Sequence, residues 1–224
     1  MLSLSEKCLK CNGTGITVEG TKCDCQASME VKIPIVLDIP LQYQDIQFEP
    51  DLVPMNMPRE YGITLDDILE VIKTKGSYPS NLLICSPPNT GKTVFAYTIF
   101  RYQYLRGLKV LQLIDLIEAR EILMSNGFDE DSQLNKSRLV EAPIVVIKIP
   151  LDLPNKFAET ISTIIERRVR RGGITIFLYG NSSRNLLAQD KYGTLKSLIR
   201  DGSYNSVKLI EYRMREENSD GTQD

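Results

Sequence analysis

The chain has 224 residues, which is enough for one large domain or for one domain with a small appendage. Its residues are 42% hydrophobic and 25% charged, as in an ordinary globular protein, and the formal net charge of -2 excludes a global basic field that would attract nucleic acid. The sequence contains no histidine, which excludes histidine-based acid–base catalysis, Ser-His-Asp triads and mixed Cys/His metal sites.

Apolar runs and cysteines indicate the compartment. No apolar run approaches the roughly 20 residues of a membrane-spanning helix, and the opening MLSLSEKCLKC lacks the apolar segment of a secretion signal. Four of the five cysteines lie in the first 25 residues, which indicates metal ligation in a reducing compartment rather than a disulfide framework. We therefore expect a cytoplasmic protein that has no membrane contact.

The N-terminal cysteines form a cluster with the spacing of metal ligands. A C-x-x-C pair and a C-x-C pair are separated by a short glycine-containing loop, and the four residues are Cys8, Cys11, Cys23 and Cys25. Four thiolates complete the tetrahedral coordination of Zn²⁺ and leave no position for water. We predict a structural zinc knuckle within residues 1–30 that folds only with metal and offers a binding surface. The alternative is four reduced thiols in a flexible leader.

Strands and helices are predicted to alternate after this cluster. Residues 31–44 contain two prolines and no sustained helical period, so we expect a linker there. The predicted helices span residues 64–76, 92–106 and 158–171, with another beginning at Asp115 and short ones after residue 180. The predicted strands span residues 82–85, 108–114, 143–149, 174–179 and 206–210. Continuous apolar strands that alternate with helices indicate an α/β fold with a parallel sheet covered on both faces.

Three smaller features complete the domain prediction. The acidic run Asp129-Glu130-Asp131 is interpreted as a solvated loop. Cys85 lies in an apolar strand and is interpreted as a small buried hydrophobic residue, separate from the N-terminal cluster. The main domain is predicted over residues 45–214, and residues 215–224 are interpreted as a disordered acidic tail.

The octet SPPNTGKT lies between a predicted strand and a predicted helix. It matches the phosphate-binding loop G-x-x-x-x-G-K followed by Ser or Thr, with Ser86 in place of the first glycine. In that context the backbone N–H groups would face phosphate oxygens, Lys92 would contact the outer phosphates and Thr93 would offer a hydroxyl to Mg²⁺. Serine is small enough for the turn if its φ angle stays negative. The predicted ATP- or ADP-binding residues are Ser86, Pro87, Pro88, Asn89, Thr90, Gly91, Lys92 and Thr93.

The segment around this loop resembles a known family. The run NLLICSPPNTGKTVFAYTIFRYQYLRGLKVLQLIDLIEARE is similar to the core of the DnaC/DnaI-type helicase loaders and the related IstB transposition ATPases. The resemblance covers about residues 45–214 and implies an AAA+ P-loop domain that acts in DNA replication. It also implies a hexameric replicative helicase as partner, engaged by the zinc module, and a possible homo-oligomer. The divergence from the family suits a protein encoded by a bacteriophage and working in a bacterial host cell.

The same resemblance implies roles for residues in the second half of the chain. The run TIIERRVRRGGITIFLYGNSSRNLL is similar to the family's sensor-1 region and places Asn181 near the γ-phosphate. A plain turn asparagine is the alternative for that residue. The run KYGTLKSLIRDGSYNSVKLIEYRMR is similar to the family's closing segment, with Arg213 near sensor 2. Arg200 lies near the arginine finger, although strict register puts Leu198 at that position.

One departure from the family concerns hydrolysis. The family's Walker B strand ends in two acidic residues that bind Mg²⁺ and polarise the attacking water. The strand PIVVIKI in that position ends in Lys148-Ile149, followed by Pro150. Lysine repels Mg²⁺ and cannot act as a base, although its charge could neutralise phosphate oxygens. Asp152 is the nearest carboxylate and would have to replace the missing acids, so we predict weak or absent hydrolysis.

A basic cluster ends the helix predicted before the sensor strand: Arg167, Arg168, Arg170 and Arg171. It is interpreted either as a solvated face that complements the helix dipole or as a contact to single-stranded DNA or to a neighbouring subunit. Other functions also fit parts of the sequence. A transposition-helper ATPase would not need a zinc module. An adaptor that only binds nucleotide fits the missing acids, and a superfamily 3 viral helicase shares the loop pattern but needs acids that this chain lacks.

Overall fold

The computed structural model describes residues 39–43, 52–54, 65–105, 112–125, 130–203 and 205–214. The chain divides into two compact units, Met1–Ile46 and Gln47–Asp224. In the described part of the first unit, a 3₁₀ turn, η1 (Leu41–Tyr43), lies within the predicted linker, and the N–H group of Tyr43 donates to Pro40 O at 2.8 Å. The four clustered cysteines and the predicted tail lie outside the described residues, so the zinc knuckle and the disordered tail stay predictions.

The second unit is built on a six-stranded sheet with the strand order β1-β6-β2-β5-β4-β3. Its strands are β1 (Leu52–Pro54), β2 (Asn81–Cys85), β3 (Gln112–Asp115), β4 (Ile144–Ile149), β5 (Ile174–Tyr179) and β6 (Val207–Met214). The last five are parallel to one another, which confirms the predicted parallel sheet. The short β1 pairs antiparallel with β6 and was not expected from the sequence.

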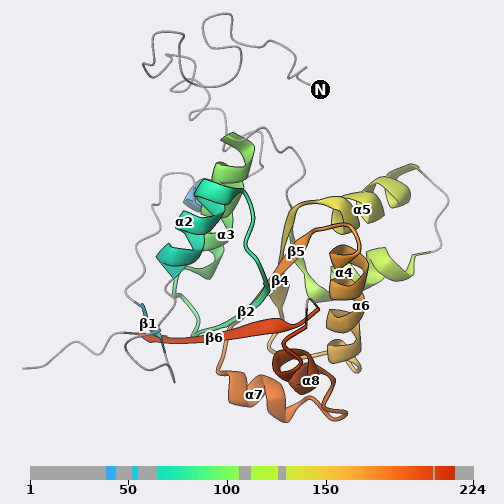
Figure 1. Cartoon of the computed structure of the whole chain (residues 1–224). Helices are drawn as coiled ribbons and strands as arrows, with labels where there is room; N and C mark the ends of the chain where they lie inside the picture. Colours follow the sequence, from blue (N-terminus) through green and yellow to red (C-terminus); the bar gives the residue numbers. More distant parts are fainter. Residues whose placement is uncertain are drawn as a thin grey trace, which may run out of the picture. The chain divides into compact units, whose positions relative to one another are not determined.

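Helices cover both faces of this sheet. They are α2 (Leu65–Lys75), α3 (Lys92–Leu105), α4 (Leu116–Met124), α5 (Glu130–Glu141), α6 (Phe157–Val169), α7 (Ser183–Ala188) and α8 (Thr194–Arg200). Figure 1 shows α2 beside α3 on one side of the sheet, and α4 with α6 on the other. Every helix in the described ranges is too short or too polar to cross a bilayer.

The alternation of side chains along the strands divides the core between the two faces. Leu83 and Cys85 of β2 share one core cluster with Phe177 of β5 and with buried residues of α4, α6 and α8. The intervening residues of β2, Leu82 and Ile84, are also fully buried but point to the other face, because successive side chains of a strand alternate. That second face is the one that α2 and α3 cover, so it is the face on which the phosphate loop continues into a helix.

The packing of α2 comes from an apolar stripe with helical spacing. Its buried residues recur at i, i+3, i+4 and i+7, and they are Leu65, Ile68, Leu69 and Ile72. The helix ends where Gly76 takes a left-handed φ of 80° and its N–H group donates to Ile72 O at 2.8 Å. Gln103 of α3 is buried, and its Nε2 donates to Gly76 O at 2.6 Å, which fixes the end of α2 against α3.

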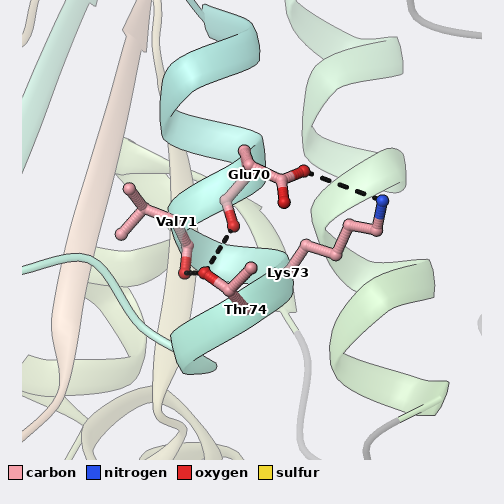
Figure 2. A network of polar contacts seen from close by, with 4 residues as sticks. All are labelled: Glu70, Val71, Lys73 and Thr74. Atoms are coloured by element: carbon pink, nitrogen blue, oxygen red, sulfur yellow. Dashed lines mark hydrogen bonds and ion pairs between the residues drawn. The ribbon is translucent and has the colours of Figure 1, made fainter.

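The exposed side of α2 carries local polar contacts, which Figure 2 shows, and Lys73 Nζ also lies 5.9 Å from the centre of the Tyr102 ring of α3. Lys73 Nζ lies 3.7 Å from Glu70 Oε2, and Thr74 Oγ1 donates to Glu70 O at 2.8 Å and to Val71 O at 3.3 Å. An exposed ion pair of this kind contributes only about 0.3–0.5 kcal/mol. The buried stripe packed against α3, rather than the polar face, therefore holds α2 in place.

The acidic run that was interpreted as a solvated loop is in part a helix, and that interpretation is wrong for two of its residues. Glu130 and Asp131 form the first turn of α5, while Asp129 lies outside the described residues. Carboxylates are favoured there because the N-terminus of a helix carries partial positive charge. Leu139 is the buried residue of α5, so the sequence has no apolar stripe that would have predicted this helix.

The basic cluster at the end of α6 also requires a correction. Arg167, Arg170 and Arg171 are exposed, and Arg170 forms an i,i+4 ion pair with Glu166 at 2.7 Å. Arg168, in contrast, is fully buried, so it cannot contact single-stranded DNA as the sequence interpretation proposed. The other three arginines keep both interpretations, at the edge of the sheet where β5 begins.

Four hydrogen bonds explain why an arginine is buried at this position. Arg168 Nη1 donates to Leu139 O at 2.6 Å, and Nη2 donates to Ala142 O at 2.8 Å and to Ile174 O at 2.5 Å. Its Nε donates to Thr175 Oγ1 at 2.9 Å. The guanidinium thereby donates to carbonyl groups at the end of α5 and the start of β5 and joins these two elements. Arg168 is a structural residue.

Candidate nucleotide-binding site

The predicted phosphate loop follows β2, a fully buried strand between β5 and β6. The N–H group of Ser86 donates to Tyr179 O at 3.2 Å, so the loop leaves the sheet directly after this residue. Asn89 and Gly91 then take left-handed φ angles of 61° and 78°. Asparagine and glycine are the residues that adopt this conformation most readily, which explains their places in the turn. Ser86 is not among the residues with positive φ, so serine is tolerated there without backbone strain.

The ammonium group of Lys92 lies inside this loop. Its Nζ donates to Ser86 O at 2.9 Å, to Ser86 Oγ at 3.0 Å and to Thr90 Oγ1 at 3.0 Å, and it also contacts Pro87 O. The side chain is half-buried, and burial lowers the pKa of Lys92 from 10.5 to about 8. At neutral pH the ammonium therefore keeps its charge and lies where a phosphate group would enter the loop.

Two buried hydroxyl groups support this arrangement, and the sequence did not identify their role. Ser86 Oγ and Thr90 Oγ1 lie 2.9 Å apart, and Thr90 Oγ1 donates to Pro87 O at 2.9 Å. Sequence reasoning treated Ser86 only as a tolerated replacement for glycine, whereas its hydroxyl is a ligand of the Lys92 ammonium. No motif signals this role, because the usual loop has glycine at that position.

The start of α3 supplies the rest of the loop. The N–H group of Phe95 donates to Gly91 O at 2.8 Å and closes the first turn of the helix. Thr93, the residue predicted to offer a hydroxyl to Mg²⁺, lies half-buried in this turn. Backbone N–H groups at a helix N-terminus and a nearby lysine together form a site for an anion such as phosphate. The residues of the loop therefore fit the phosphate groups of a nucleotide.

The end of β5 places Asn181 next to the phosphate-loop strand, because β5 pairs with β2. Asn181 Oδ1 accepts a hydrogen bond from Ser182 N at 2.8 Å. Ser182 caps α7, and the next residue, Ser183, contacts Glu211 of β6 through both its N–H group, at 3.1 Å, and its hydroxyl. Glu211 thus fixes the segment that carries Asn181. This contact spans 28 residues and has no local signal in the sequence.

Lys148 lies near the end of β4, two strands away from the phosphate-loop strand. It pairs with Leu178 of β5, which in turn pairs with Ile84 of β2. Ile147 and Ile149 belong to the core cluster of α4 and α6, so the side chain of Lys148 points to the opposite face, which α3 covers. Lys148 is exposed, and the last two residues of β4 include no carboxylate. The carboxyl end of this strand therefore carries a cation on the side of the phosphate loop.

Two carboxylates near this edge, those of Asp152 and Asp115, lie on different segments of the described structure. Asp152 is exposed, beyond Pro150, in the segment whose Leu151 side chain lies against Gly180. Asp115 pairs with Lys148 from β3, but its Oδ1 accepts from Ile117 N at 2.8 Å and caps α4. No group of three or more potential metal-ligating side chains occurs among the described residues. Asp152 and Asp115 therefore do not form a pair of adjacent acids like that of a Walker B strand.

The two remaining predicted arginines lie on separate elements. Arg200 is the last residue of α8 and is exposed, while Leu198, in the strict register of the arginine finger, is half-buried against the core. Arg213 lies in β6 and pairs with Val53 of β1, and its side chain is outside the described residues. Of these positions, Arg200 offers an exposed cation.

Comparison with known proteins relates this architecture to solved structures. No protein-family model matches the chain, and no curated protein matches it. A crystal structure of DnaI aligns with 16% identity and a TM-score of 0.50, covering 80% of this chain and 89% of DnaI. A structure of the DnaC helicase loader aligns with 17% identity and a TM-score of 0.47, covering 67% and 93%. AMPPCP-bound DnaA from Aquifex aeolicus aligns with 12% identity and a TM-score of 0.39, covering 65% and 56%.

The likeness to DnaI concerns the fold, because so few residues are identical. The chain has the architecture of a P-loop α/β protein, with five parallel strands, helices on both faces and the loop after a central strand. The fold class predicted from the sequence is confirmed to this extent.

Proposed function

We propose that the chain binds ATP or ADP through its phosphate loop. The observation that carries this proposal is the position of the Lys92 ammonium within reach of four loop oxygens, at the start of a helix whose N-terminus opens on the loop. Phosphate oxygens would replace these contacts and also accept from the loop N–H groups. The direct test is titration with a fluorescent ATP analogue, in which Lys92→Ala abolishes binding. Equal affinity of wild type and Lys92→Ala would overturn the proposal.

Hydrolysis is proposed to be weak or absent. Lys148 occupies the strand position from which an acidic residue would bind metal and polarise water, and Asp152 is the nearest replacement. Phosphate release should therefore stay at the background rate with and without single-stranded DNA. Robust turnover that Lys92→Ala abolishes would contradict this, and its loss in Asp152→Asn would then identify Asp152 as the substitute for the missing acids. Asn181, Arg200 and Arg213 are the other proposed contributors to any turnover.

For the biological role, we propose a helicase loader of the DnaC/DnaI type that recruits a hexameric replicative helicase to DNA. The support is the resemblance of the sequence around the loop, together with a fold that is similar to DnaI. In this proposal, the cysteine cluster binds Zn²⁺ and engages the helicase, the exposed arginines Arg167, Arg170 and Arg171 contact single-stranded DNA, and the chain assembles with copies of itself. A bacteriophage source and a cytoplasmic location belong to the same proposal.

Binding to a helicase separates this role from the alternatives. The full chain should retain a hexameric bacterial replicative helicase in a pull-down, and Cys8→Ser should lose both the zinc and the helicase. A transposition helper would instead assemble on duplex DNA and ignore the helicase. An adaptor that does not hydrolyse nucleotide is the second candidate. It is favoured by the presence of Lys148, in place of an acid, near the end of β4. Helicase binding that is indifferent to the cysteines would remove the zinc module from the proposal.

A further inference from the structure

The carboxyl end of β4 carries a lysine where the family that the sequence resembles has metal-binding acids. Mg²⁺ in phosphate sites is bound through one or two carboxylates together with the phosphates, and it neutralises their charge. In β4, Lys148 occupies the position of such a carboxylate, and its charge has the opposite sign. An ammonium group repels a metal ion, but it can bind the same phosphate oxygens directly.

The register of the strands places Lys148 two strands from the loop strand and on the face where the loop continues into α3. One strand, β5, separates β4 from β2, so the two backbones lie about 10 Å apart. Lysine has a flexible four-carbon stem, and Lys148 points to the face on which α3 begins. Asp115 lies a further strand away, about 14 Å from β2, and its side chain is short. Of these two edge residues, the lysine is nearer to the loop and has the longer side chain.

A simpler role for Lys148 would be to neutralise the aspartate beside it. Asp115 is its partner in the strand register, but the carboxylate of Asp115 caps α4. Within the described residues no ion pair joins these two side chains. Lys148 is also exposed, so packing does not account for it.

We propose that Lys148 replaces the metal ion at the phosphate site, so that the chain binds a nucleoside diphosphate or triphosphate without Mg²⁺. This inference rests on the proposed nucleotide binding. It adds that Lys148 takes the place of Mg²⁺ in that binding. Lys92 would contact the phosphates from the loop and Lys148 from β4. Two ammonium groups carry one positive charge fewer than one lysine and one divalent ion would, but each can donate hydrogen bonds directly to phosphate oxygens.

The test is a titration of the full chain with fluorescent ADP and ATP analogues, in buffers with Mg²⁺ and in buffers from which divalent ions were removed by a chelating resin. Added EDTA is avoided, because it would also remove zinc from the predicted cysteine site. We expect the wild-type Kd to change less than about twofold between the two buffers, and Lys148→Met to weaken magnesium-free binding about tenfold or more. Lys148→Asp should bind poorly without Mg²⁺ and regain about tenfold when it is added.

Any other outcome contradicts either the role of Lys148 or the proposed nucleotide binding itself. If the wild type binds only with Mg²⁺, or if Lys148→Met binds as well as the wild type without it, the inference is wrong. If Mg²⁺ strengthens binding to the wild type and this gain is lost in Asp152→Asn, then Asp152 binds the ion instead. If no nucleotide binds in either buffer, the proposed function fails as well. Lys75→Met is the matched control, because Lys75 is exposed at the end of α2, by the opposite edge of the sheet.

Discussion

Two cations at opposite edges of the sheet are both surrounded by oxygen atoms, but they have different roles. Lys92, at the carboxyl edge, is half-buried, and its acceptors belong to a loop. Arg168, near the amino end of β5, is fully buried, and its acceptors are three backbone carbonyls and a hydroxyl. Phosphate can replace the contacts of the first cation, whereas nothing can replace those of the second. A ring of oxygens therefore indicates binding only where a ligand has access to it.

The pKa values of Lys92 and Arg168 also distinguish the two groups, because only that of Lys92 lies close to physiological pH. Burial lowers the pKa of Arg168 from 12.5 to about 9, and the pKa of Lys92 from 10.5 to about 8. Arg168 is charged throughout the physiological range, so its role does not vary with pH. Lys92 titrates close to that range, so its interaction with phosphate does. The predictions below change one cation or its ligands at a time.

The largest effect is expected from Arg168→Met, which keeps much of the side-chain volume but removes all four hydrogen bonds. Carbonyls of Leu139, Ala142 and Ile174 would each lose a buried hydrogen bond. The free energy of unfolding should fall by about 3 kcal/mol, after allowance for the relief of a buried charge. Urea denaturation followed by far-ultraviolet circular dichroism measures this loss, since the chain has no tryptophan.

The neighbouring arginine is the control for that prediction. Arg167 is exposed, so Arg167→Met should change the free energy of unfolding by less than about 0.5 kcal/mol. Equal losses in the two variants would mean that Arg168 does not hold α5 against β5. Gly173→Ala offers an independent approach, because an added Cβ would lie 2.9 Å from Ala142 O and 3.0 Å from Arg168 Nη2.

The sequence predicted the parts of this fold whose signals are local. Apolar runs identified the five parallel strands, and the spacing of SPPNTGKT identified the phosphate loop. The strand β1 was missed because it has three residues and pairs with β6 from far along the chain. Helix α5 was missed because its buried surface depends on one residue, Leu139.

The contacts that organise the site depend on distances in space that no local pattern records. Glu211 reaches Ser183 across 28 residues, and Asn81 Oδ1 accepts from Thr175 N across 94 residues. Arg168 looks like its basic neighbours in the sequence, and only the fold shows that it faces the core. The sequence thus locates the turn between β2 and α3 well and assigns clustered charges poorly.

A smaller effect is expected from pH on nucleotide affinity. In the proposed site phosphate binds the ammonium form of Lys92, and the free protein loses that form as the pH rises through about 8. Binding above this pH requires uptake of a proton, so affinity should fall about eightfold from pH 7.5 to pH 9. Titrations with a fluorescent ADP analogue across this range measure the change. Lys92→Arg, which stays charged at these pH values, should give a flat profile at its own affinity, and a flat wild-type profile would contradict the lowered pKa.

The smallest effect concerns the hydroxyl that distinguishes this loop from an ordinary one. Ser86 Oγ accepts a hydrogen bond from the Lys92 ammonium and must be exchanged for phosphate when nucleotide enters. Ser86→Ala removes this competing ligand but keeps the Cβ, so the backbone of the loop is not loosened as it would be by glycine. The affinity for ADP should therefore rise about threefold to tenfold, as expected for one partly compensated hydrogen bond. A fall in affinity would show instead that the hydroxyl contacts the phosphate, and Ser86 would then be a ligand of the nucleotide rather than of the lysine.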